Sequence, residues 1–131
     1  MTRDAFLQLV DSALASIPSR FRDAIVNVAI VVEDQPNAAQ LAEVDATSDE
    51  TLLGLYEGIP LPERGWAHGN TLPDKVTLFQ RPIENASEDD DDIVVAIGET
   101  LIHELGHYFG LSEEEIEEIE ERYWRGEGDD E

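Results

Sequence analysis

The first residues of the chain place apolar side chains three and four positions apart. This spacing gathers them on one face of an α-helix, and a capping residue before the helix with a proline after it is typical of its limits. Thr2 and Pro18 stand at these two positions. The pattern predicts a helix to about Ile17, with a buried face formed by Phe6, Leu9, Val10, Ala13, Leu14 and Ile17.

Three later segments have the composition of β-strands. Residues 25–32 are rich in β-branched side chains, which predicts a strand at the centre of a sheet. Residues 52–58 and 76–80 predict two further strands, and Pro82 is expected to stop the last one. Residues 37–50 are polar and acidic, so we expect a loop there.

The last part of the chain predicts two helices separated by a glycine. The acidic run at residues 87–92 can cap the first helix and oppose its dipole. Gly110 suits a left-handed C-cap, and Ser112 with Glu115 forms a capping box for a final helix to about Trp124. The first of these helices has an apolar stripe formed by Ile93, Val94, Ile97, Leu101, Leu105 and Tyr108.

This order of elements predicts one small α+β domain. It has an N-terminal helix, about three strands in a mixed sheet, a long helix and a C-terminal helix. The domain is expected to cover residues 1–125, and the acidic residues 126–131 are expected to form a disordered tail. The length of 131 residues suits a single domain.

The charge of the chain limits its partners. With 31 acidic and eight basic residues, the formal charge is −23. Such a surface repels phosphate groups, so we expect neither nucleic acid nor an anionic membrane as a partner. Solubility, or adaptation to a salty interior, explains this charge more simply than steering of basic peptides.

Composition also limits the chemistry and the location. The chain has no cysteine, so disulfides and thiolate metal ligands are excluded. We find no secretory signal pattern, and no segment approaches the roughly 18–20 apolar residues that cross a bilayer. The expected location is the cytoplasm.

A His-Glu-x-x-His motif starts at His103. On a helix, His103 and His107 lie one turn apart on the same face and can bind one zinc ion. Glu104 projects from the next position, where it can take a proton from a zinc-bound water. Without cysteine, such an ion is held by nitrogen and oxygen, which favours a catalytic site with an open position.

These residues have two other interpretations. The histidines could be surface residues of an amphipathic helix, with Glu104 in an ordinary solvated pair; the helical context and the break at Gly110 count against this. A di-iron site would need a second Glu-x-x-His on another helix. The chain has only one further histidine, His68.

The motif continues with Gly110 and Glu113, each three residues after the last. The result, His-Glu-x-x-His-x-x-Gly-x-x-Glu, resembles the elongated zinc motif of the metzincin metallopeptidases. In that motif the last position is His or sometimes Asp and is the third zinc ligand. The resemblance implies that His103, His107 and Glu113 bind one zinc ion, with Glu113 as a longer carboxylate at the third position.

Three stretches together resemble a more compact family, the small bacterial zincin-like metallopeptidases, also called minimal metzincins. They are residues 27–34, 52–61 and 103–113. The resemblance spans most of the chain apart from the tail and implies a small zincin-like α+β domain. Full-size metzincins place a methionine-containing turn beneath the zinc; Met1 is the only methionine here, and the compact family is expected to lack that turn.

The leading hypothesis is a zinc-dependent metallopeptidase with a peptide or protein as its substrate. Glu104 would be the general base and then pass its proton to the leaving amine. The segment at residues 76–80 is expected to offer a strand edge that binds the substrate backbone. One rival is a zincin-fold binding protein that keeps the metal without turnover, and another is an acidic interaction module for basic partners.

Several further residues are candidates for the site. Glu114 and Glu117 are alternatives to the third ligand. His68 could contact the substrate, although a surface role is more common for a histidine in a glycine-rich loop. Tyr56 and Tyr123 could stabilise an oxyanion, but core packing is the more common role for such residues.

Overall fold

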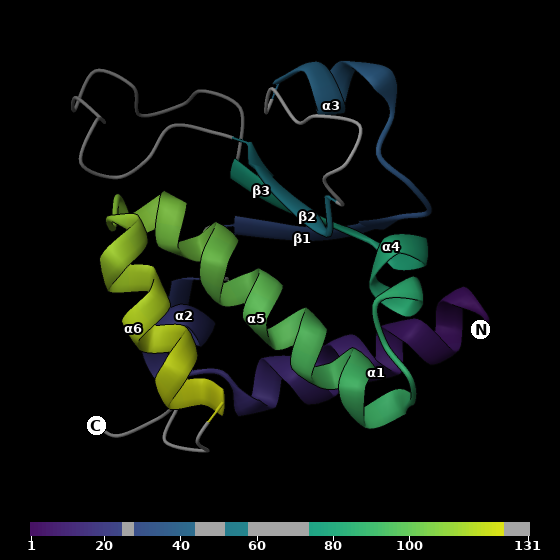
Figure 1. Ribbon diagram of the computed structural model, residues 1–131, viewed down its shortest axis with the longest axis horizontal. Helices are drawn as coiled ribbons and strands as arrows, with labels where there is room; N and C mark the ends of the chain where they lie inside the picture. Colours follow the sequence, from purple (N-terminus) through teal and green to yellow (C-terminus); the bar gives the residue numbers. More distant parts are fainter. Residues whose placement is uncertain (25–27, 44–51, 58–73, 125–131) are drawn as a thin grey trace.

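The computed structural model describes residues 1–24, 28–43, 52–57 and 74–124. The longest helices pack together on one side of a small sheet (Figure 1). This arrangement confirms the predicted α+β domain with a three-stranded mixed sheet. The predicted tail at residues 126–131 and His68 lie outside the described residues.

The sheet has the strand order β1-β3-β2. The strands are β1 (Val28–Glu33), β2 (Gly54–Glu57) and β3 (Asp74–Phe79). β1 runs parallel to β3, whereas β2 runs antiparallel to it with Tyr56 opposite Val76. β3 therefore uses both of its edges, and among the described strands the outer edge of β2 pairs with no other strand. The helix α5 (Asp90–Phe109) packs against β2.

Two expectations about the sheet were wrong. The segment predicted at the centre, residues 25–32, supplies β1, which pairs only with β3 among the described strands. A run of β-branched residues indicates burial of the two faces of a strand, but carries no information on how many strands pair with its edges. Residues 76–80 belong mostly to the central β3, so they offer no free edge to a substrate.

The helix α1 (Arg3–Ser16) forms as predicted, with the Thr2 hydroxyl accepting a bond from the backbone N–H of Ala5 at 3.1 Å. Three short helices were not predicted: α2 (Ser19–Ala24), α3 (Ala38–Glu43) and α4 (Gln80–Asn85).

The loop predicted over residues 37–50 is wrong at α3. Asn37 and Gln40 cap its start with reciprocal side-chain bonds of 2.8 Å, which is a capping box with amides in both positions. Pro82 does not stop a strand but lies in the first turn of α4, where a missing N–H costs no helical hydrogen bond. Gln80 accordingly begins this helix and does not end the strand.

The helix α5 (Asp90–Phe109) is the longest in the described part of the chain and reaches the sheet and most of the other helices. The Asp89 carboxylate caps it by accepting from the N–H of Asp92 at 2.9 Å, as the acidic run predicted. Gly110 ends the helix at a φ of 75°, a conformation that favours glycine. Its buried face consists mainly of Ile93, Ile97, Leu101, Ile102, Leu105 and Tyr108.

The C-terminal helix α6 (Glu113–Trp124) packs closely on α5. Its start has the predicted capping box, with bonds of 2.9 and 3.1 Å between Ser112 and Glu115. The close approach depends on two glycines of α5. A Cβ atom at Gly98 would overlap the hydroxyl of Tyr123, and one at Gly106 would lie 2.7 Å from the side chain of Ile116.

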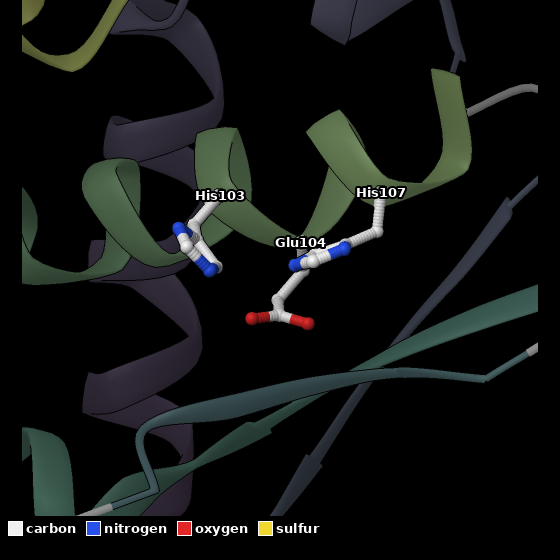
Figure 2. Close-up of side chains that lie close together, drawn as sticks. All are labelled: His103, Glu104 and His107. Carbon is white, nitrogen blue, oxygen red and sulfur yellow. The ribbon is translucent and has the colours of Figure 1, made fainter. Parts of the chain in front are cut away.

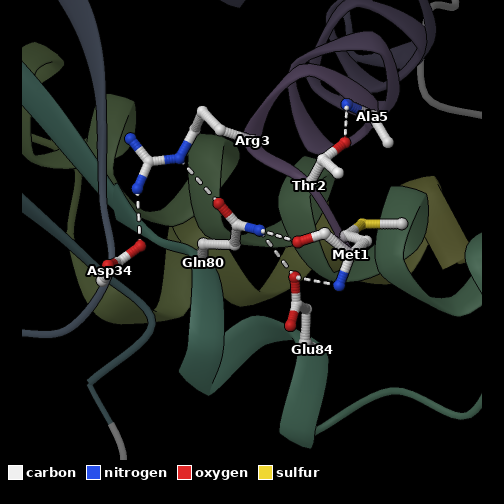
Figure 3. A network of polar contacts seen from close by, with 7 residues as sticks. All are labelled: Met1, Thr2, Arg3, Ala5, Asp34, Gln80 and Glu84. Atoms are coloured by element: carbon white, nitrogen blue, oxygen red, sulfur yellow. Dashed lines mark hydrogen bonds and ion pairs between the residues drawn. The ribbon is translucent and has the colours of Figure 1, made fainter.

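A polar network ties the start of α1 to the junction of β3 and α4 (Figure 3). Arg3 donates to Gln80 at 2.7 Å and pairs with Asp34 at 2.6 Å. The amide nitrogen of Gln80 donates to the Met1 carbonyl and to Glu84. These bonds satisfy a buried amide and fix α1 against the sheet.

No described helix is both long and apolar enough to cross a lipid bilayer.

Truncating Ile116 to Ala should lower the free energy of unfolding by about 2–5 kcal/mol, because this side chain is 0% exposed at the contact of α5 and α6. Urea denaturation followed by circular dichroism measures the change. Leu7→Ala is the control, since Leu7 is 42% exposed and should cost about 0.5 kcal/mol or less. Equal losses of unfolding free energy in the two variants would contradict the burial of Ile116 between α5 and α6.

Candidate metal centre

The last two turns of α5 bring three potential metal ligands together. His103, Glu104 and His107 project from the helix toward the sheet (Figure 2). One ligand atom from each lies within 4.8 Å of the others, and the two imidazole centroids are 5.0 Å apart. The spacing of the motif on a regular helix produces this arrangement.

Glu113 approaches the same point from the start of α6. One of its carboxylate oxygens, Oε1, lies 3.9 Å from Nε2 of His103 and 3.9 Å from Nε2 of His107. A tetrahedral zinc ion with bonds of about 2.0–2.1 Å separates its ligand atoms by about 3.3–3.4 Å. The two distances from Glu113 exceed this separation by about 0.5–0.6 Å, and the donor set of two imidazoles and one carboxylate fits zinc.

The turn between the helices explains this approach. Gly110 reverses the chain immediately after α5, and the capping box at Ser112 starts α6 two residues later. Glu113 is thus the first residue of the new helix and stands beside the end of the old one. Glu114 and Glu117, the alternatives considered from sequence, are exposed and pair with neither imidazole among the described residues.

The comparisons with known proteins agree with this geometry. The family model described as zincin-like metallopeptidase matches residues 25–123. The chain belongs to this family. A solved structure, a conserved hypothetical protein from Thermus thermophilus, is 22% identical and has a TM-score of 0.53, over 83% of this chain and 94% of that one. That likeness shows a shared fold. No functionally curated protein matches the chain.

In this member of the zincin-like metallopeptidase family, sequence reasoning missed one residue beside the motif. Nδ1 of His103 lies 3.3 Å from Oε1 of Glu120, which is 24% exposed on α6. A carboxylate only accepts hydrogen bonds, so Nδ1 carries the proton and Nε2 is left to bind a metal. The sequence spacing could have indicated this contact. Glu120 follows Glu113 by seven residues, which places it two turns farther along the same face of α6.

The two imidazoles differ in their electrostatic surroundings. The hydrogen bond to Glu120 raises the pKa of His103, with smaller contributions from Glu104 and Glu113 against the opposing effect of burial. Burial lowers the pKa of His107, and the nearby charge of His103 lowers it further. In the metal-free protein, His107 is thus the imidazole that more readily stays neutral, as a metal ligand must be.

Glu104 is held by the edge of the sheet. Its Oε1 accepts a hydrogen bond of 2.9 Å from the backbone N–H of Tyr56 in β2. Burial raises the pKa of this carboxyl to about 7, although the charge of His103 and the bond from Tyr56 act in the opposite direction. A carboxyl with a pKa near neutrality can both accept and release a proton at pH 7.

The tyrosines considered from sequence make contacts typical of packed side chains. The hydroxyl of Tyr56 donates to Asp74 at 2.7 Å, and its ring stacks edge-on against Tyr108. The hydroxyl of Tyr123 lies 3.2 Å from that of Ser16. Both hydroxyls thus bond residues outside the motif.

Replacing Glu104 by Gln should stabilise the metal-free protein by about 3 kcal/mol near pH 8. Burial raises the pKa of this carboxyl from 4.5 to about 7, and each pKa unit corresponds to about 1.4 kcal/mol. Below 4.5 the carboxyl is protonated in the folded and unfolded chains alike. Between these two values the unfolded chain loses its proton first, so the stability of the unsubstituted protein falls as pH rises.

Urea unfolding of chelator-treated protein from about pH 5 to about pH 8 tests this expectation. The difference between Glu104→Gln and the unsubstituted protein should grow with pH across this range. Glu88→Gln removes the same charge from an exposed site, so its difference should stay constant. A pH-independent effect of Glu104→Gln would show that burial does not raise the pKa of this carboxyl.

Proposed function

We propose that this protein is a zinc-dependent peptidase that hydrolyses peptide bonds in a peptide or protein substrate. The observation that carries the proposal is the position of Glu113, whose Oε1 lies 3.9 Å from both Nε2 atoms of the motif histidines. Two imidazoles and a carboxylate facing one point, beside a buried glutamate, are the parts of a catalytic zinc site with an open position.

His103, His107 and Glu113 would hold the metal. When bound, a zinc ion lowers the pKa of a coordinated water from about 15.7 to about 7 and polarises a substrate carbonyl. Glu120 would orient His103 through Nδ1, which keeps Nε2 directed at the site. The ligands come from only two helices, and the capped turn between them sets their separation.

Glu104 would move the proton. Its carboxylate takes a proton from the attacking water and returns it to the nitrogen of the leaving amine. In the metal-free protein, burial raises the pKa of this carboxyl to about 7, which makes it a stronger base than an exposed glutamate. The bond from the N–H of Tyr56 holds one oxygen in place and leaves the other for the proton.

The edge of β2 would bind the substrate backbone, in place of the segment proposed from sequence. The Leu53 carbonyl accepts from the N–H of Phe79, so Leu53 and alternate residues after it face β3. Gly54 and Tyr56 then face the free edge, and Tyr56 reaches Glu104 from there. The N–H of Tyr56 is already bonded to Glu104, so a peptide added to this edge would bond the remaining outward backbone groups and pass beside the motif residues.

Glu104→Gln tests the function. The variant should keep one zinc per chain while cleavage of an unbiased peptide library falls by about 10²–10⁴-fold. Elemental analysis measures the metal, and mass spectrometry of the digested library measures cleavage. Glu88→Gln is the matched control and should change neither quantity.

The same experiment separates the rival functions. A metal-retaining binding protein would contain zinc but cleave nothing in the unsubstituted form. An acidic interaction module would contain no stoichiometric zinc when purified without added metal.

Zinc affinity should follow the order unsubstituted protein, then Glu120→Gln, then Glu113→Gln. Replacing the charged acceptor of the His103 Nδ1–H by a neutral amide should weaken zinc binding by about 10–100-fold, and replacing a direct carboxylate ligand should weaken it more. Glu114→Gln is the control, because Glu114 is exposed and contacts neither imidazole. Competition with a chromophoric chelator measures each affinity. A Glu114→Gln variant as weak as Glu113→Gln would show that the third ligand is misassigned.

A further inference from the structure

A pocket of about 360 Å³ opens directly beside the candidate metal centre. His103 and Glu104 form part of its wall, so the pocket and the centre share two side chains. This volume lies at the small end of the range for ligand sites, about 300–1,000 Å³, which suits one amino-acid side chain better than a cofactor.

The pocket lies between three elements. α5 supplies one wall, α6 supplies Glu120, and the residues that enter β2 supply the third side. The floor is closed where β2 meets α5, because a Cβ atom at Gly54 would overlap the methyl group of Thr100. A peptide on the edge of β2 with its scissile bond at Glu104 would direct a neighbouring side chain into this space.

The lining combines an apolar wall with carboxylates. Leu52, Leu53 and Ala96 provide the apolar surface. Glu99 and Glu120 provide two half-buried carboxylates in addition to Glu104, and no lysine or arginine is among the described residues that line the pocket. A long aliphatic stem with a cationic end matches this combination, because the stem packs on leucine and the charge meets carboxylate.

We propose that this pocket is the specificity pocket of the enzyme and binds a lysine or arginine side chain next to the scissile bond. The proposal rests on the proposed function, and it adds the substrate class. Glu99 is the residue whose substitution tests the proposal, since Glu104 is assigned to proton transfer and Glu120 to the orientation of His103. A neutral side chain would gain no ion pair with these carboxylates, and an acidic side chain would be repelled by them.

Paired peptides that differ only in charge test the proposal. Library digestion first locates the preferred cleavage position, and two peptides are then made with arginine or its neutral isostere citrulline there. The zinc-loaded protein should cleave the arginine peptide with a kcat/KM about 10–100-fold higher, the range expected for one well-placed charged hydrogen bond.

Substituting Glu99 assigns the preference to this pocket. In Glu99→Gln, the ratio of kcat/KM for the arginine peptide to that for the citrulline peptide should fall to near one, while the zinc content stays the same. Glu88→Gln removes an equal charge from an exposed loop and should leave the preference intact. If both variants lost the preference for arginine over citrulline, the net charge of the protein would explain that preference. This result would overturn the proposed role of the pocket.

A binding measurement keeps the inference separate from turnover. Titration of zinc-loaded protein with acetyl-arginine amide or acetyl-citrulline amide, followed by NMR, should shift the Gly54 and Glu99 amide signals only with arginine. Equal binding of the two amides would overturn the inference. Cleavage of peptides without a basic preference would do the same and leave the peptidase function standing. Arginine binding without any cleavage would support the pocket and count against the peptidase function.

Discussion

The structure of the site depends on one docking contact, that of α5 against the edge strand β2. The N–H of Tyr56 reaches across this contact to Glu104, and Gly54 gives the Thr100 methyl group the room it needs. The bond brings a carboxylate into a place where burial raises its pKa to about 7. A carboxylate on an exposed turn of the same helix would keep its ordinary acidity and would be a weaker base at neutral pH.

The two faces of α5 contribute differently to the structure. Its apolar face, which includes Ile97 and Leu101, is buried in the core of the domain. Its other face presents the imidazoles and lines the adjoining pocket. Since the core holds the helix rigidly, side chains that project from its last two turns are positioned more accurately than they would be on a loop. The helix α6 adds Glu113 and Glu120, which approach the imidazoles of α5.

The sequence was informative where a pattern is local. The long helix, its caps, the turn at Gly110 and the positions of His103 and His107 follow from spacing along one stretch of chain. The edge position of β1 and the contact of Glu120 with His103 were not predicted, since each depends on which distant segments pack together. Short helices such as α3 were missed because six residues contain too few turns to show a period.

All three proposed ligands lie between His103 and Glu113, on two helices joined by one tight turn. Little chain entropy is lost when so short a segment closes, so this helical hairpin gathers the donors at a low entropic cost. An ion that also associates with the partly folded hairpin adds less to global stability than its affinity for the native protein suggests.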